Sequence, residues 1–287
     1  MTRIILMLVI GLSLGRLSAQ VTISETTYEG HNHFLITTPG AVYYYDRAGG
    51  GLSRMIDPDG KDWITFKKEP WDQYPASAAS AYRGIPNLVF RSDDAGAGHP
   101  GHDQCQSEQL GEQSIRSVSK SGKWQWTWTF FDHYARLDIQ QVNPEHAYWF
   151  LYEGTPGGEF KPAAQYFGTD QSGPHDDQLN YADGGKLFDQ FRWAYFGHQE
   201  SDRVLYLAQL HPDEASDLFS YLGNSDAGLQ SADGMVVFGF GRAEGAQPLM
   251  KNPNTFFLGF YEQQINNRRD HRKFSRSIRK NLRSKRN

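Results

Sequence analysis

The chain has one cysteine in 287 residues, Cys105, so a disulfide within the chain is excluded. Small exported domains often depend on disulfides. A body of this length does not need them, because it buries roughly 70–75% of its unfolded surface. The neighbours of Cys105 in sequence, Asp103 and Glu108 among them, are acidic or neutral and do not favour a thiolate. We therefore expect a sheltered thiol.

The local motifs of several common enzyme classes are also absent. There is no G-x-S-x-G elbow, no phosphate loop ending in Gly-Lys-Ser/Thr, no H-E-x-x-H pair and no dinucleotide fingerprint. We expect no cofactor and no metal. The paired carboxylates of a glycosidase stay open, because their separation is spatial and no sequence spacing fixes it.

Long apolar runs are missing as well. The run from Ile4 to Leu14 is eleven residues, whereas a membrane span needs roughly 20. It follows Arg3 and precedes Leu17-Ser18-Ala19, which is the layout of a cleavable secretory signal. We therefore expect a signal peptide over residues 1–19 and a periplasmic or secreted mature protein.

Charge is distributed unevenly along the chain. Residues 21–267 hold 17 Lys+Arg against 32 Asp+Glu, a balance of −15, whereas residues 268–287 hold ten against one, a balance of +9. An acidic body argues against nucleic acid as a partner, because phosphate contacts need a basic surface.

Strand signals recur through the body at short spacing, separated by Gly, Pro, Asp and Asn. Many short strands without helices between them predict an all-β fold, a two-sheet antiparallel β-sandwich in one domain over residues 20–267. We expect one short helix at 74–80 and a long loop at 154–183. The expected strands are 34–38, 41–45, 52–56, 124–131, 134–140, 147–153, 204–210, 235–240 and 256–262.

Two neighbouring segments give the clearest strand pattern. Trp126, Trp128 and Phe130 alternate with polar residues, and the segment 134–140 alternates in the same way after a turn at Asp132-His133. These segments should pair as a hairpin with one apolar face.

The basic tail, residues 268–287, places Phe274, Ile278 and Leu282 four residues apart, which is typical of an amphipathic helix. The alternative is a disordered extension. The tail is expected to contact an anionic surface or the acidic body.

The most unusual local sequence is D-D-A-G-A-G-H-P-G-H-D, residues 93–103. Histidine titrates near neutral pH, so His99 or His102 is a candidate general base or acid. Together with Asp103 they are also candidate metal ligands, although no zinc-type spacing is present. The structural alternative is that both histidines only form hydrogen bonds with the backbone of their own loop.

Four further segments carry candidate site residues. Arg83 suits a carboxylate through two parallel hydrogen bonds, and the adjacent tyrosine is a candidate proton donor. Glu153 lies at the end of an expected strand. It is either a candidate for acid–base chemistry or a residue that accepts hydrogen bonds from the backbone of the following loop. The aromatic rings of the segment 193–198 are candidates for stacking on a sugar face, although aromatic residues on strands more often belong to the core. The complete set is Tyr82, Arg83, His99, His102, Glu153 and His198 as catalytic candidates, with Arg136, Trp193 and Arg242 as substrate-binding candidates.

Several strings resemble those of a group of exported bacterial proteins: Y-Y-Y-D-R-A-G-G-G-L-S-R-M-I-D (43–57), Y-R-G-I-P-N (82–87), L-Y-E-G-T-P-G-G (151–158) and V-F-G-F-G-R (237–242). The meander around the Gly49-Gly50-Gly51 turn also resembles the opening of galactose-mutarotase-like sandwiches, the fold of aldose epimerases and several polysaccharide lyases. The resemblance extends over most of the body and matches no single family's catalytic motif. It implies a super-sandwich and a polysaccharide or oligosaccharide partner.

Three hypotheses follow. The first is a lyase that cleaves an acidic polysaccharide by β-elimination, with Arg83 on the uronate carboxylate, His99 or His102 as base, Tyr82 as proton donor and Trp193 as stacking platform. The second is a non-catalytic glycan-binding or cell-envelope protein. The third is a mutarotase-like or hydrolytic enzyme that uses Glu153 and His198 on a neutral sugar. The acidic body disfavours the first unless several arginines line one groove, namely Arg83, Arg136, Arg192, Arg203 and Arg242.

Overall fold

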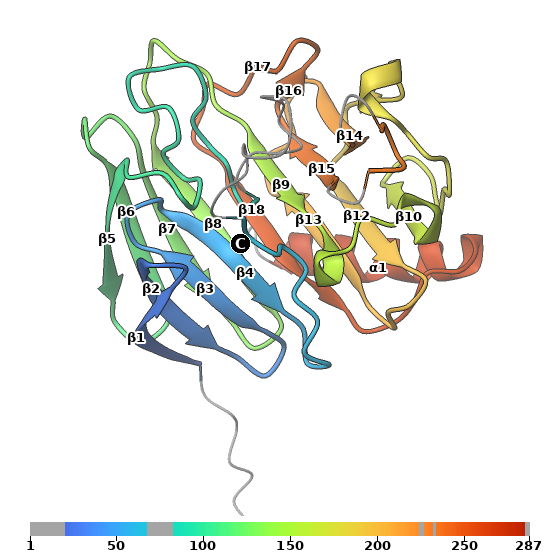
Figure 1. Ribbon diagram of the computed structural model, residues 1–287, viewed down its shortest axis with the longest axis horizontal. Coiled ribbons are helices and arrows are strands. Elements are labelled where there is room, and N and C mark those ends of the chain that lie inside the picture. Colours follow the sequence, from blue (N-terminus) through green and yellow to red (C-terminus); the bar gives the residue numbers. More distant parts are fainter. Residues whose placement is uncertain (1–20, 68–82, 224–226, 232–233, 285–287) are drawn as a thin grey trace, which may run out of the picture.

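The computed structural model describes residues 21–67, 83–223, 227–231 and 234–284 (Figure 1). In this part of the chain the sheets are antiparallel and one α-helix lies at the C-terminal end, which confirms the predicted all-β sandwich. The expected signal peptide, the expected helix at 74–80 and Tyr82 lie outside the described residues.

The larger layer is an eight-stranded sheet in the order β10-β12-β13-β18-β8-β7-β6-β5. It contains the hairpin predicted from sequence, in which Trp128 pairs with Leu137 and the alternate indole rings face the core. Its strands are β5 (Cys105–Leu110), β6 (Ser114–Ser119), β7 (Gln125–Phe130), β8 (Tyr134–Gln141), β10 (Gln165–Thr169), β12 (Trp193–His198), β13 (Val204–Gln209) and β18 (Thr255–Tyr261).

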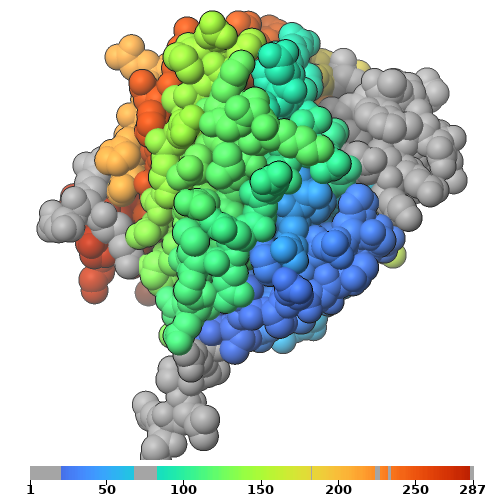
Figure 2. Space-filling model, turned by 90° about the vertical axis from the view of Figure 1, so that its left-hand side faces the viewer, coloured from blue at the N-terminus to red at the C-terminus, as the bar shows by residue number. Residues whose placement is uncertain are grey.

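The opposite layer consists of two four-stranded sheets in the orders β1-β2-β3-β4 and β11-β14-β15-β9. Figure 2 shows the first of them, in blue, beside the green strands of the large sheet. The strands are β1 (Thr22–Tyr28), β2 (His31–Thr37), β3 (Val42–Asp46), β4 (Gly51–Ile56), β9 (Phe150–Gly154), β11 (Leu187–Asp189), β14 (Asp217–Leu222) and β15 (Met235–Phe240), and a separate pair is β16 (Arg242–Ala243) and β17 (Gln247–Pro248).

A short extended segment joins these two small sheets. Ile85 exchanges backbone hydrogen bonds with Leu52 of β4 at 2.7 and 3.2 Å, and Gly84 exchanges them with Glu153 of β9 at 2.8 and 2.9 Å. The segment therefore fills the gap between β4 and β9, so that the layer is nearly continuous. This bridge fixes the position of Glu153.

The core lies between the two layers and is rich in aromatic rings. Phe150 of β9 stacks on Phe256 of β18 with ring centroids 4.3 Å apart, and Phe167 of β10 stacks on Phe219 of β14 at 4.1 Å. Stacked aromatic pairs stabilise the packing beyond the area they bury. These contacts hold the two sheets face to face.

The helix α1 (Arg268–Ser284) lies on the outer face of the large sheet. Its predicted apolar stripe, Phe274, Ile278 and Leu282, is buried in a cluster with Trp193 and Tyr195 of β12. No helix of the described residues is long and apolar enough to cross a membrane.

The expected long loop at 154–183 is partly wrong. It contains β10 and the 3-10 turns η2 (Pro156–Gly158), η3 (Pro162–Ala164) and η4 (Tyr181–Asp183). All five residues of β10 are buried, so the strand has no polar alternate face to mark it. The sequence analysis also missed β1, β5, β6, β11, β12, β14 and the short pair β16 and β17 as strands.

Candidate functional site

A buried polar cluster lies beside β9, on the face of the small sheet turned away from the core. Its members are His99, Glu153, Asn87 and Arg242, and we call it the His99–Glu153 cluster. The exposed fractions of His99, Glu153 and Arg242 are 4%, 4% and 3%. Three candidates that the sequence placed 54 or more residues apart are thus brought together with Asn87.

Hydrogen bonds define how the cluster is protonated. The ring atom Nδ1 of His99 lies 2.9 Å from the carbonyl of Pro100, which only accepts, so Nδ1 carries a proton. Nε2 lies 3.2 Å from Oε2 of Glu153, and Oε2 also accepts from Asn87 Nδ2 at 2.9 Å. Two acceptors do not bond to one another. The His99–Glu153 contact therefore holds one further proton, on Nε2 or on Oε2.

Arg242 supplies positive charge to the same cluster. It directly follows Gly241, which comes after β15 and has a φ of +74°, and its Nη1 lies 3.8 Å from Oε1 of Glu153. The guanidinium also lies over the rings of Trp149 at 5.1 Å and Tyr181 at 5.4 Å. Cation–π contacts of this kind hold the charge in a largely apolar surrounding.

His102 adjoins the cluster without joining its hydrogen bonds to Glu153. Its ring meets that of His99 edge to face at 5.3 Å. Burial, and then the neighbouring His99, lower the pKa of His102 to about 4, so it is neutral at pH 7. Asp103 instead pairs with Lys120 at 2.9 Å. Among the described residues no group of three or more His, Cys, Asp or Glu side chains is arranged to hold a metal ion.

Arg83 begins the bridging segment but points elsewhere. Its side chain is buried, and it donates to the carbonyls of Thr65 at 3.2 Å and Gly234 at 3.0 Å. Lys67 lies close enough that burial, followed by the charge of Arg83, lowers the Lys67 pKa to about 8. The bonds from Arg83 tie loop backbone together, which is a different task from the uronate clamp proposed from sequence.

The remaining candidates lie apart from the cluster. His198 ends β12 in the large sheet, where its Nδ1 accepts from the backbone of Glu200 at 3.1 Å, and burial lowers its pKa. Arg136 lies on the outer face of β8, in an ion pair with Asp138 at 2.8 Å. The five arginines do not line one groove, since Arg203 pairs with Asp59 and Glu262.

The expectation that Trp193 forms a stacking platform is wrong. Its exposed fraction is 0%, and the indole lies beneath α1, with the ring of Phe274 at 5.2 Å. A ring covered in this way has no face open to a sugar. The helix that covers it is 75 residues or more away in sequence, so the local pattern gave no sign of it.

Sequence reasoning did not single out Asn87, although the quoted string Y-R-G-I-P-N ends on it. Asn87 has a φ of +47°, a conformation in which asparagine is enriched. That backbone turn directs its amide to Glu153. An asparagine directly after Ile-Pro at a chain reversal was the available signal.

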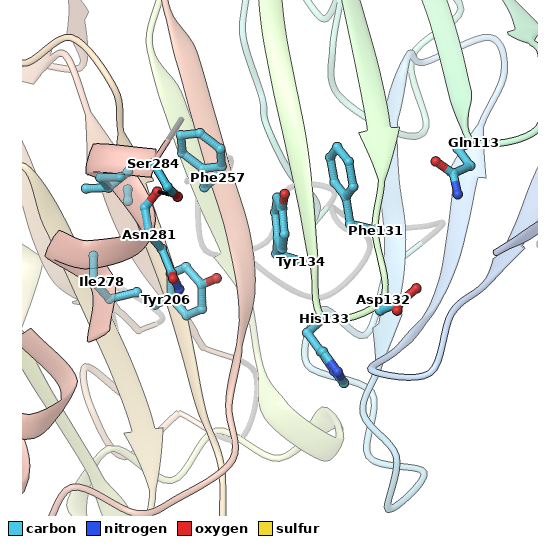
Figure 3. A pocket seen from close by; sticks show the side chains of 12 residues that line it. Gln113, Phe131, Asp132, His133, Tyr134, Tyr206, Phe257, Ile278, Asn281 and Ser284 are labelled. Atoms are coloured by element: carbon cyan, nitrogen blue, oxygen red, sulfur yellow. Dashed lines mark hydrogen bonds between the residues drawn. The ribbon is translucent and has the colours of Figure 1, made fainter. Parts of the chain in front are cut away.

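A separate cavity of about 470 Å³ lies on the opposite outer face of the sandwich, between the C-terminal end of α1 and the β7–β8 hairpin (Figure 3). Phe131 and Tyr134 stand on the hairpin side with ring centroids 4.5 Å apart, and Tyr206 and Ile278 stand on the other side. None of the sequence candidates for catalysis lines it.

Comparisons with known proteins place the fold. No protein-family model and no curated protein matches the sequence. Among solved structures, HI1317 has a TM-score of 0.53 at 11% identity over 84% of this chain and 100% of that chain. YeaD from Salmonella typhimurium, described as a proposed mutarotase, has a TM-score of 0.50 at 7% identity over 84% and 94%. A galactose mutarotase related enzyme from Lactobacillus acidophilus has a TM-score of 0.50 at 8% identity over 81% and 100%.

These identities are too low to transfer a function, but they establish the architecture. The chain has a galactose mutarotase-like fold, as the resemblance around the Gly49-Gly50-Gly51 turn indicated. Because such folds host many activities, the function has to be argued from the site.

Proposed function

We propose that the mature chain is an exported carbohydrate-active enzyme whose His99–Glu153 pair transfers protons at a sugar hemiacetal, in the manner of a mutarotase. The observation that carries the proposal is the contact of 3.2 Å between His99 and Glu153, a hydrogen bond between a candidate acid and a candidate base beside the cation of Arg242. The fold shared with a galactose mutarotase related enzyme supports the choice of substrate class.

The chemistry needs one base and one acid. Glu153, as carboxylate, would remove the proton from the anomeric hydroxyl, while His99, as imidazolium, would donate its Nε2 proton to the ring oxygen. The bond between the ring oxygen and the anomeric carbon then breaks and a carbonyl forms. Rotation and the reverse transfers give the other anomer and restore both groups. Arg242 places a positive charge beside this pair, with its Nη1 3.8 Å from Oε1 of Glu153.

Access is the structural requirement of this mechanism. In the state described here the two groups contact one another and are almost fully buried. A sugar must therefore separate them, with its anomeric hydroxyl on Glu153 and its ring oxygen on His99. Burial is also the observation that favours the second candidate, a glycan-binding protein in which the cluster has only a structural role.

The β-elimination hypothesis has less support from the geometry. It requires a cation free to neutralise a uronate carboxylate, and the contacts of Arg83 with Thr65 and Gly234 engage its guanidinium within the protein. The excess of acidic residues in the body also opposes a polyanionic chain at this face. A neutral sugar needs no free cation and is not repelled by the acidic residues.

The test is a mutarotation assay on freshly dissolved α-D-galactose and α-D-glucose, followed by polarimetry, for the mature wild type and for Glu153→Gln and His99→Gln. His198→Gln is the matched control, because His198 is also buried but lies outside the cluster. We expect the wild type to exceed the spontaneous rate and both cluster variants to lose about 100-fold or more, as for removal of a general acid or base.

A parallel arm follows ultraviolet absorbance with uronate polysaccharides. No acceleration by the folded wild type on either aldose would refute the proposal. Absorbance rising in that arm would replace it with the lyase, and saturable glycan binding without turnover would replace it with the binding protein. Thermal unfolding of each variant separates lost chemistry from lost folding.

A further inference from the structure

The exposed side of α1 forms a second site. Arg268, Arg272, Arg276 and Arg279 recur at about one helical turn and line a hollow of about 560 Å³. The opposite wall is the turn of residues 170–173, which follows β10. The hollow lies on the outer face of the large sheet, whereas the His99–Glu153 cluster lies on the opposite layer.

The four guanidinium groups carry mostly uncompensated charge: Arg279 alone acts on a carboxylate, lowering the pKa of Asp170 against the larger effect of burial, which raises it. Among the described residues none of them forms an ion pair with a carboxylate, and Arg276 Nε donates to the backbone carbonyl of Arg272 at 3.2 Å. Elsewhere arginines of the body do pair, as Arg47 does with Glu25 and Arg54 with Asp62. Like charges three and four residues apart destabilise a helix, so an arrangement of this kind is stabilised by a bound anion.

The wall opposite the arginines is built closely against α1. His271 Nδ1 lies 3.1 Å from the hydroxyl of Tyr195, and a Cβ on Gly173 would lie 3.0 Å from that same nitrogen. The one carboxylate among the lining residues, Asp170, accepts from the backbone of Arg192 at 2.9 Å. The hollow is therefore held by contacts of the fold and presents mainly guanidinium groups.

We propose that this hollow binds an acidic polysaccharide, with carboxylate or sulfate groups of successive sugars on successive arginines. The spacing favours a linear polyanion, because arginines along one helical face recur at about 5.4 Å intervals. Arg binds carboxylate and sulfate oxygens through two parallel hydrogen bonds. The site is independent of the proposed sugar chemistry and requires none of its residues.

An anionic membrane is the competing partner, and the packing of α1 disfavours it. A helix that binds at a bilayer interface buries its apolar face in lipid. In this protein that face, Phe274, Ile278 and Leu282, is already buried against the large sheet. Only electrostatic attraction to lipid remains, and stable membrane association takes a second signal.

The experiment measures binding of polygalacturonate and dextran sulfate to the mature chain by calorimetry at two salt concentrations, with neutral dextran and phosphatidylglycerol vesicles in parallel. The test variant is Arg272→Gln with Arg276→Gln. The control is Arg269→Gln with Lys280→Gln, which removes the same charge from the same helix at exposed positions outside the hollow.

We expect both polyanions to bind the wild type, more weakly at higher salt, and neutral dextran not to bind. The test variant should lose about tenfold or more in affinity, since a charge-assisted hydrogen bond contributes at least that factor, while the control changes by about twofold or less. Equal losses in both variants would show an effect of net charge and overturn the site. Binding to vesicles without binding to either polysaccharide would also overturn it.

Discussion

The attachment of α1 to the sandwich makes a strong prediction about Phe274. Its ring is fully buried and meets Trp193, Tyr195 and Tyr261 edge to face at 5.1–5.2 Å. Burying an apolar side chain of this size stabilises by about 1.5–3 kcal/mol, so the three anchors of α1 contribute roughly 5–9 kcal/mol together. No other contact of α1 with the sandwich contributes a comparable free energy, because the remaining faces of the helix are basic and exposed.

Replacing Phe274 by Ala should therefore lower the free energy of unfolding by about 3–5 kcal/mol, the usual cost of Phe→Ala in a well-packed core. The loss is measured by chemical denaturation with the tryptophan fluorescence of the sheet as probe, since Trp193 lies directly under the helix. Ser277→Ala is the matched control on the exposed side of α1, and we expect a change within about 0.5 kcal/mol.

The alternative is that α1 is a tail that attaches and detaches without coupling to the sandwich. In that case Phe274→Ala would leave the denaturation midpoint of the body unchanged and would only increase proteolysis within residues 268–284. An unchanged midpoint, with the control also unchanged, would refute the reasoning that α1 belongs to the same cooperative unit as β12 and β13.

Three further predictions concern buried polar groups. Burial lowers the His102 pKa from 6.5 to about 4, so the folded state favours the neutral ring. The free energy of unfolding should therefore keep its full value above pH 6.5 and fall by about 2–3 kcal/mol as the pH is lowered to 4. Chemical denaturation at both pH values should show a smaller loss for His102→Gln. Cys105 has a pKa raised to about 12 by burial, so a thiol reagent at pH 8 should label it only after unfolding, and rapid labelling of the native protein would contradict its placement. Asp217 accepts from the backbone N–H groups of Phe191 and Gly241, both at 2.9 Å, on its two different oxygens. In Asp217→Asn an NH2 group replaces one of these oxygens and leaves one N–H without its acceptor, so the variant should lose about 1–3 kcal/mol in thermal or chemical unfolding.

A strand was predictable from the sequence where its apolar residues form a clear pattern, either alternating with polar residues or continuous. β7 and β8 alternate apolar and polar residues, so their pairing followed from the sequence. β15 is an apolar run of six buried residues and was also found. β1 has no buried residue and β5 only one, so neither carries an apolar pattern, and both are strands because a neighbouring strand offers hydrogen bonds.

Three of the four members of the site were named from the sequence, all except Asn87, but their assembly was not predicted. His99, Glu153 and Arg242 were each named from local context, yet Glu153 was coupled to His198, which lies in the other layer. Their true grouping depends on pairing between β9 and β15 and on the bridge at Gly84, contacts that join segments tens of residues apart. No local pattern encodes such contacts.

The bridge also explains why three glycine-containing strings of the sequence occur together. A Cβ on Gly84 would lie 2.3 Å from Pro100, and a Cβ on Gly49 would lie 2.5 Å from the carbonyl of His99. The turn before β4, the bridging segment and the histidine loop are therefore closely packed, with Gly49 against the backbone of His99 and Gly84 against the ring of Pro100, and neither position has room for a Cβ. Glu153 is hydrogen-bonded to the same bridge through Gly84. The distance from His99 to Glu153 is thus set by glycine contacts outside the cluster, so the strings that carry the family resemblance position the catalytic candidates even where they contribute no reacting group.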